Sequence, residues 1–216
     1  MSTMIYFCRR ILVSSIVLVI TGSLYADEKS TETAASLPAA TPASQQKKEV
    51  PPHVVELVQG RLSLPVPGQW PVVKPRNRII KHEFSVPAAK GDTVPGRMTI
   101  MSAGGSIEAN IARWVGQFRT AEDKALGEKD KSIQKIKIGQ LEVHLVDLKG
   151  VFQDQPRGPF GPKVARPDYR MLAAIIPAQK GGTWFVKLYG PQQTIQKASK
   201  QFQAMIKNIV IAEPKG

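Results

Sequence analysis

The sequence predicts an α+β domain, in which a mostly antiparallel central sheet carries two main helices. Several short segments alternate apolar and polar residues, which is the period of a strand with one buried face. Two longer segments repeat apolar residues at spacings of three and four, as one face of a helix does. Before these segments lie a short apolar run and a polar stretch with too few apolar residues to form a core.

Residues 1–26 have the three-part order of a secretory signal peptide: two arginines, the apolar run Ile11–Ile20 and small residues before Ala26. The run has about ten residues, whereas a membrane-spanning helix needs roughly 20. We therefore expect cleavage after Ala26 and export to the periplasm, the envelope or the medium. Leu24 stands where a small residue is favoured, so an uncleaved N-terminal anchor remains the alternative.

The position of the single cysteine and the net charge limit which reactions and which partners the exported part can have. Cys8 is the only cysteine and precedes the apolar run, whereas the acylated cysteine of a lipoprotein would follow it. Cleavage would therefore remove thiol nucleophiles, disulfides and cysteine metal sites together. Loss of Arg9 and Arg10 would leave 28 basic against 17 acidic residues, a net charge of +11. Such a protein attracts anionic surfaces over about 10 Å at moderate salt.

Residues 27–53 are rich in Ser, Thr, Ala, Pro, Gln and Lys, which predicts a flexible linker. Residues 54–213 then form the predicted domain, near the usual size of a single one. Its first strands are expected at Arg61–Val66, Ile79–Val86 and Arg97–Met101.

The first helix is predicted to begin after Ser106, because serine is a favoured N-cap residue and Glu108 suits the positive end of the helix dipole. Its apolar face consists of Ile107, Ile111, Trp114, Val115 and Phe118.

Further strands are expected at Ile133–Ile138, Leu141–Phe152, Tyr169–Ile176 and Trp184–Tyr189. The nearly continuous apolar run in Tyr169–Ile176 is typical of a strand covered on both faces. Gly190 and Pro191 are expected to open the final helix. Its buried residues are Ile195, Ala198, Phe202, Met205 and Ile209.

Three segments, Ala103–Trp114, Tyr169–Leu172 and Phe185–Pro191, resemble those of a family of exported bacterial proteins without assigned function. This resemblance covers most of residues 54–211. More remotely, the element order resembles the PsbP-like α/β/α sandwich of extrinsic photosystem proteins, a Ran-binding import factor and some envelope lipoproteins. The resemblance implies binding rather than catalysis, and it carries no functional residue over to this chain.

Catalytic, cofactor and metal sites are not predicted. His53, His82 and His144 lie far apart without helical metal-binding spacing, and we expect the last two to be exposed strand residues. Ser102 and Ser106 flank two glycines but lack the Gly-x-Ser-x-Gly spacing of a nucleophile elbow. A glycine-rich turn between a strand and a helix explains them equally well.

Two basic segments are the candidate partner-binding residues. The first consists of Lys74, Arg76, Arg78 and Lys81. The second lies in the predicted long loop Gln153–Pro167 and consists of Arg157, Phe160, Lys163 and Arg166, with the further basic residue Arg170 just beyond the loop. Arginine grips phosphate or carboxylate bidentately, and long loops are often functional. The alternatives are an ordinary solvated surface and a merely mobile insertion.

Aromatic residues offer a second hypothesis. Trp114, Trp184 and Phe202 either line a ligand pocket between sheet and helix or belong to the core. Trp70, beside a proline, is the aromatic that we least expect to be buried.

The sequence thus favours an exported, non-enzymatic binding module of the cell envelope. We expect its basic loops to dock on a protein assembly or on an anionic polymer or membrane surface. The alternative is a carrier of an amphiphilic small molecule, which requires an apolar cavity of several hundred Å³. An enzyme of unfamiliar type is a third hypothesis. Nucleic acid is disfavoured by export and by the lack of an aromatic stacking platform.

Overall fold

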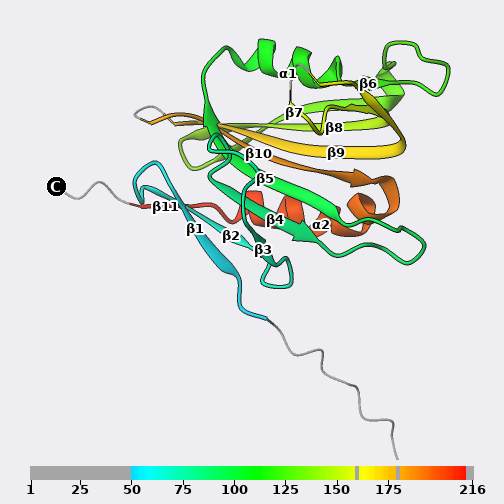
Figure 1. Ribbon diagram of the computed structural model, residues 1–216. Coiled ribbons are helices and arrows are strands. Elements are labelled where there is room, and N and C mark those ends of the chain that lie inside the picture. The colour runs from blue at the N-terminus through cyan, green and yellow to red at the C-terminus, as the bar shows by residue number, and fades with distance from the viewer. Residues whose placement is uncertain (1–49, 159–160, 179–180, 213–216) are drawn as a thin grey trace, which may run out of the picture. The chain divides into compact units, whose positions relative to one another are not determined.

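The computed structural model describes residues 50–158, 161–178 and 181–212 (Figure 1). These residues form two β-sheets and two α-helices. The predicted signal segment 1–26 and residues 27–49 of the predicted linker lie outside these residues. The first described strand begins at His53, within one residue of the predicted start of the domain.

The larger sheet has eight strands in the order β3-β4-β5-β10-β9-β8-β6, with β7 also paired to β8. Every pairing in it is antiparallel, which confirms the predicted sheet. Its strands are β3 (Val72–Val73), β4 (His82–Val86), β5 (Gly96–Ala103), β6 (Phe118–Arg119), β7 (Lys131–Ile138), β8 (Leu141–Asp154), β9 (Val164–Ala178) and β10 (Gly182–Pro191).

A second sheet of three strands has the order β1-β2-β11, and sequence reasoning found only its middle strand. The strands are β1 (His53–Leu57), β2 (Leu62–Val66) and β11 (Val210–Ile211). Val58 and Gln59 at the β1–β2 turn have positive φ angles of 54° and 56°, which residues other than glycine seldom adopt.

Helix α1 (Ile107–Val115) begins as predicted, because the Ser106 side chain accepts a hydrogen bond from the Ala109 backbone N–H at 3.1 Å. Helix α2 (Gln192–Lys207) follows Pro191 directly. The Asp92 carboxylate accepts hydrogen bonds from the Thr194 backbone N–H at 2.8 Å and from its hydroxyl at 2.5 Å. The loop between β4 and β5 is thereby tied to the first turn of α2.

Alternate residues of the large sheet supply two separate cores, one on each face. On β10, Phe185 packs into a cluster with Trp114 of α1, whereas Val186 and Leu188 pack with Phe202 of α2 and with the small sheet. Figure 1 shows the two helices on opposite sides of the sheet. The predicted α+β architecture with two main helices is confirmed.

Several predicted element boundaries were wrong: β4 begins at His82 rather than Ile79, and Ile209 lies beyond the end of α2. Two further errors concern α1 and the β8–β9 connection. Helix α1 ends at Val115, so Phe118 is not on its apolar face but in β6, where it pairs with Phe152 of β8. The loop predicted at Gln153–Pro167 spans only residues 155–163, because the β8–β9 hairpin extends to the pair Asp154 and Val164. Polar strand ends carry too few apolar residues to reveal this extension.

Three predicted exposures were also wrong. His144 is only 6% exposed, because β8 lies inside the sheet between β7 and β9 and is covered on both faces. Trp70 is 1% exposed and belongs to the core on the α2 side. His82 is half-buried rather than exposed.

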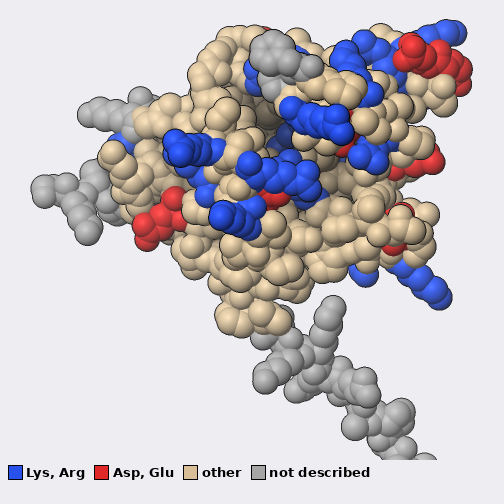
Figure 2. Space-filling model, viewed as in Figure 1, with Lys and Arg blue, Asp and Glu red and all other residues tan. Residues whose placement is uncertain are grey.

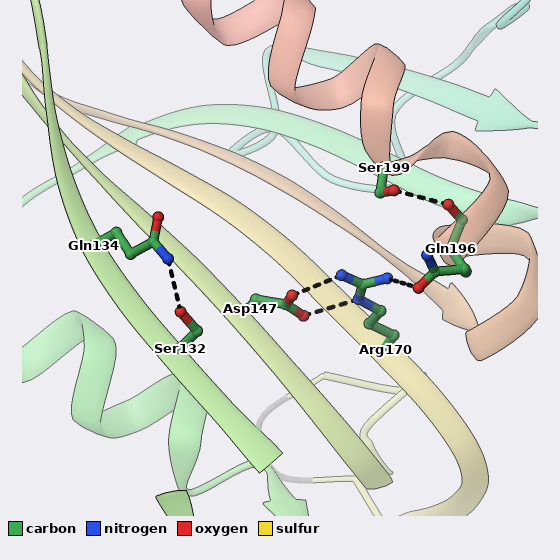
Figure 3. Close-up of polar contacts among 6 residues, drawn as sticks. All are labelled: Ser132, Gln134, Asp147, Arg170, Gln196 and Ser199. Atoms are coloured by element: carbon green, nitrogen blue, oxygen red, sulfur yellow. Dashed lines mark hydrogen bonds and ion pairs between the residues drawn. The ribbon is translucent and has the colours of Figure 1, made fainter. Parts of the chain in front are cut away.

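One ion pair links the sheet to α2 through Arg170. Arg170 of β9 donates to both carboxylate oxygens of Asp147 in β8, at 2.8 and 2.6 Å. Its remaining Nη1 donates to Gln196 of α2 (Figure 3). The Arg170 side chain is 8% exposed and that of Asp147 is 28% exposed. Such a desolvated guanidinium depends strongly on its partner.

We predict that Asp147→Ala lowers the free energy of unfolding by about 2 to 4 kcal/mol, because it leaves a buried charge without its counter-ion. Urea denaturation measures the loss. Lys135→Ala, which breaks the solvent-exposed pair between Lys135 and Glu142, is the control and should cost much less. Equal losses in the two variants would contradict the role given to the buried pair.

Candidate functional site

A pocket of about 350 Å³ opens on the α1 side of the large sheet, beyond the end of the helix. Strands β4, β5, β9 and β10 contribute its floor, where Arg97, Tyr169 and Tyr189 lie. Its rim comes from three connections: the segment after β3, the loop before β5 and the β8–β9 hairpin. The pocket is therefore built from parts of the chain that are far apart in sequence.

The two predicted basic segments meet at this pocket. Arg76 of the first segment and Arg166 of the second both line it. Figure 2 shows Lys and Arg side chains gathered around a hollow on this face. The other basic residues of the two segments, all exposed, are Lys74, Arg78, Lys81, Arg157 and Lys163. Phe160 lies outside the described residues.

An ion pair on the pocket floor fixes Arg97, which sequence reasoning missed. Its Nε and Nη2 donate to the two carboxylate oxygens of Glu83 at 2.7 and 2.8 Å, and its Nη1 donates to the Tyr189 hydroxyl. Burial alone would raise the pKa of Glu83, but the hydrogen bond and charge of Arg97, with a further contribution from Arg76, lower it. Both partners therefore stay ionised, and the Arg97 guanidinium is held in one orientation.

The Arg166 guanidinium is held less tightly. Its nearest carboxylate, Asp154, lies 3.4 Å away, and the Arg166 side chain is 42% exposed. A guanidinium has five N–H donors in a planar fork, so contact with one oxygen of Asp154 leaves most of them for a ligand. Arg166 is thus the wall residue best placed to contact an incoming anion.

Lys187 of β10 lies two residues before Tyr189 on the same face of the sheet, next to the pocket but not in its lining, and sequence reasoning missed it as well. Its amine sits over the rings of Tyr189 and Phe152, 5.1 and 5.6 Å from their centroids, and donates to Gln117 at 3.1 Å. Burial, followed by the positive charges of Arg113 and Arg97, lowers the pKa of Lys187 to about 8. A lysine in the middle of the apolar Trp184–Tyr189 strand was the available signal.

The predicted alternative sites are not brought together. Trp114 packs on the α1 side of the sheet and Phe202 on the α2 side, with Trp184 partly buried beside the α2 core, so the three cannot line one pocket. The two pockets beside α2 measure about 170 and 70 Å³, below the several hundred Å³ of the expected carrier cavity.

The three histidines lie on three different strands, β1, β4 and β8. Over residues 50–158, 161–178 and 181–212, no group of three or more His, Cys, Asp or Glu side chains could hold a metal ion. In the same part of the chain, no helix is long and apolar enough to cross a membrane. The pocket lining instead offers guanidinium groups, phenol hydroxyls and carboxylates, which can bind a ligand through hydrogen bonds and charge.

No family model and no curated protein matches this chain. Several solved structures are similar to it, among them the following two. A protein of unknown function from Pseudomonas aeruginosa is 12% identical with a TM-score of 0.40, covering 76% of this chain and 99% of its own. The cyanobacterial PsbP of Synechocystis is 8% identical with a TM-score of 0.46, covering 79% and 98%. The second match is to a PsbP protein, and neither match brings an activity to this chain.

The lowered pKa of Lys187 predicts a stability that depends on pH. Between about pH 8 and pH 10 the unfolded chain keeps the lysine proton while the folded protein has released it, so stability rises with pH. Relative to Lys187→Met, the free energy of unfolding of the natural protein should therefore rise by up to about 1.4 kcal/mol per pH unit in this range. Denaturation of both proteins across the range measures this difference, and a difference independent of pH would contradict the assignment.

Proposed function

We propose that this protein is an exported, non-enzymatic binding module that docks on an anionic component of the cell envelope. The observation that carries the proposal is the convergence of two basic segments, distant in sequence, on the rim of one pocket. Seven of the eight predicted partner-binding residues are described, and six of these are exposed while Arg166 is partly so. They stand where a partner surface could reach them without any rearrangement of the core.

Electrostatics supports an anionic partner. Three arginines line the pocket, against the two carboxylates Glu83 and Asp154, of which Glu83 is already neutralised by Arg97. Exposed lysines and arginines of both segments extend the positive surface beyond the rim. Solvent screening makes each exposed charge weak by itself, so binding by such a face depends on several charges acting together and falls with salt.

The apolar run at residues 11–20 supports the export part of the proposal. We predict that the mature protein isolated from its own cells begins at Asp27, because a signal peptidase would cleave after Ala26. N-terminal sequencing of that material is the measurement. A chain that retains Met1 and resides in the soluble cytoplasm would contradict export.

Charge reversal at the rim tests docking. We expect Lys74→Glu, Arg78→Glu and Lys163→Glu together to release the protein from washed envelopes at a markedly lower salt concentration than the natural protein needs. None of the three residues lines the pocket. The readout is the salt concentration that extracts half of the bound protein.

The matched control reverses three exposed lysines of α2, on the other side of the sheet, as Lys197→Glu, Lys200→Glu and Lys207→Glu. It changes the net charge by the same amount, so it should behave like the natural protein if the rim is the docking surface. If both triple variants are extracted at the same salt concentration, net charge alone explains retention and the proposal fails.

A further inference from the structure

We propose that the pocket binds a small anionic sugar, meaning a hydroxylated ring that carries one carboxylate or phosphate, and that the charge of Lys187 controls its affinity. This inference rests on the proposed function, since the pocket lies at the centre of the same basic face. It goes further by naming the unit that the face recognises. The pocket volume of about 350 Å³ lies at the lower end of the range for small-molecule sites.

The anionic group is matched by guanidinium groups that reach the pocket from different parts of the chain. Arg76 comes from the segment after β3, and Arg166 from the start of β9. Arg97 lies between them on β5, and its orientation is fixed by Glu83. Guanidinium groups bind carboxylate and phosphate through paired hydrogen bonds, and a group held rigidly before binding loses little entropy on contact.

The ring is matched by the rest of the lining, which combines polar, aromatic and apolar groups. Tyr169 and Tyr189 offer hydroxyls and ring surface, while the Asp154 carboxylate and the Ser85 hydroxyl accept hydrogen bonds. Tyr169 is held by stacking on Phe152, with the centroids 6.0 Å apart and the planes inclined by 11°. This mixture suits a ligand with many hydroxyl groups better than an aliphatic one, which would leave the polar groups unpaired.

Lys187 couples the pocket to proton binding. The charged groups around its amine are Arg113 of α1, Arg97 of β5 and Asp154 of β8. The amine also lies over the rings of Tyr189 and Phe152. Only Asp154 among the charged groups favours the protonated amine. A bound anion would add a second negative charge, so anion and proton should stabilise each other. Affinity should then fall as the pH rises above about 8, where the free protein loses this charge.

Calorimetry of the natural protein with glucuronate as the probe tests the pocket. Glucuronate stays ionised from neutral to basic pH, so it contributes no titration of its own. We expect binding that is at least about tenfold tighter than that of glucose, because the guanidinium groups are matched only by the anion. Glucose 6-phosphate distinguishes a phosphate from a carboxylate preference, and inorganic phosphate tests whether the ring is needed. Failure to bind either anionic sugar, or equal affinity for inorganic phosphate, would overturn the inference.

Single variants locate the site. Arg166→Ala should weaken glucuronate binding by about tenfold, through the loss of its paired hydrogen bonds. Lys163→Ala removes an exposed charge from the same hairpin, does not line the pocket and should leave the affinity nearly unchanged. Equal effects of the two would mean a diffuse attraction to the rim and would overturn the site.

The pH series tests Lys187. Between about pH 7 and pH 9 the natural protein should lose roughly three- to tenfold in affinity for glucuronate, whereas Lys187→Met should show no such fall. A parallel fall in both proteins would overturn the role of Lys187. The triple rim variant described above separates the two proposals, because it should lose envelope retention but keep glucuronate binding. If docking is lost in that variant and no sugar binds to the natural protein, only the present inference fails.

Discussion

The requirement that both faces of the large sheet be covered organises the molecule. The central strands β9 and β10 present apolar residues on both faces, so each face needs a partner to exclude water. Helix α2 and the small sheet cover one face, while α1 has only nine residues against the 15 of β9. A helix of that length spans about 13 Å and cannot follow the strands to their ends. The uncovered part of the face is where the sheet turns polar and the pocket forms.

The large sheet carries two bidentate arginine–carboxylate pairs, one on each face. On the α2 face, Asp147 pairs with the Arg170 guanidinium, which is only 8% exposed and also donates to Gln196 of α2. Arg97 and Glu83 form the same kind of pair at the floor of an open pocket. The first pair therefore serves the fold, whereas the second also presents charged and hydroxyl groups to the solvent. The two pairs have the same chemistry but different roles, because α2 covers the first whereas α1 does not reach the second.

Sequence reasoning identified the sheet, both helices and the two basic segments, because each rests on local periodicity or composition. It missed β1, β3, β6 and β11, whose short or polar pairings depend on contacts distant in sequence. It placed Arg76 and Arg166 in separate segments, since nothing local indicates that they share a pocket. Arg97 and Lys187 were not among the predicted site residues. Arg97 lines the pocket and Lys187 lies next to it because α1 ends before it can cover this part of the sheet.

The Asp92 contact with Thr194 has a consequence for communication across the sheet. Val94 and Pro95, close to Asp92 in the same loop, form part of the pocket rim on one face, while Thr194 opens the helix that covers the other. Gly96 and Gly190 pack so closely at this edge that a Cβ built on Gly190 would lie 2.9 Å from the Gly96 Cα. The rim therefore has little room to shift without taking the helix start along. A ligand that shifts the pocket rim on one face of the sheet would therefore also shift the start of α2 on the opposite face.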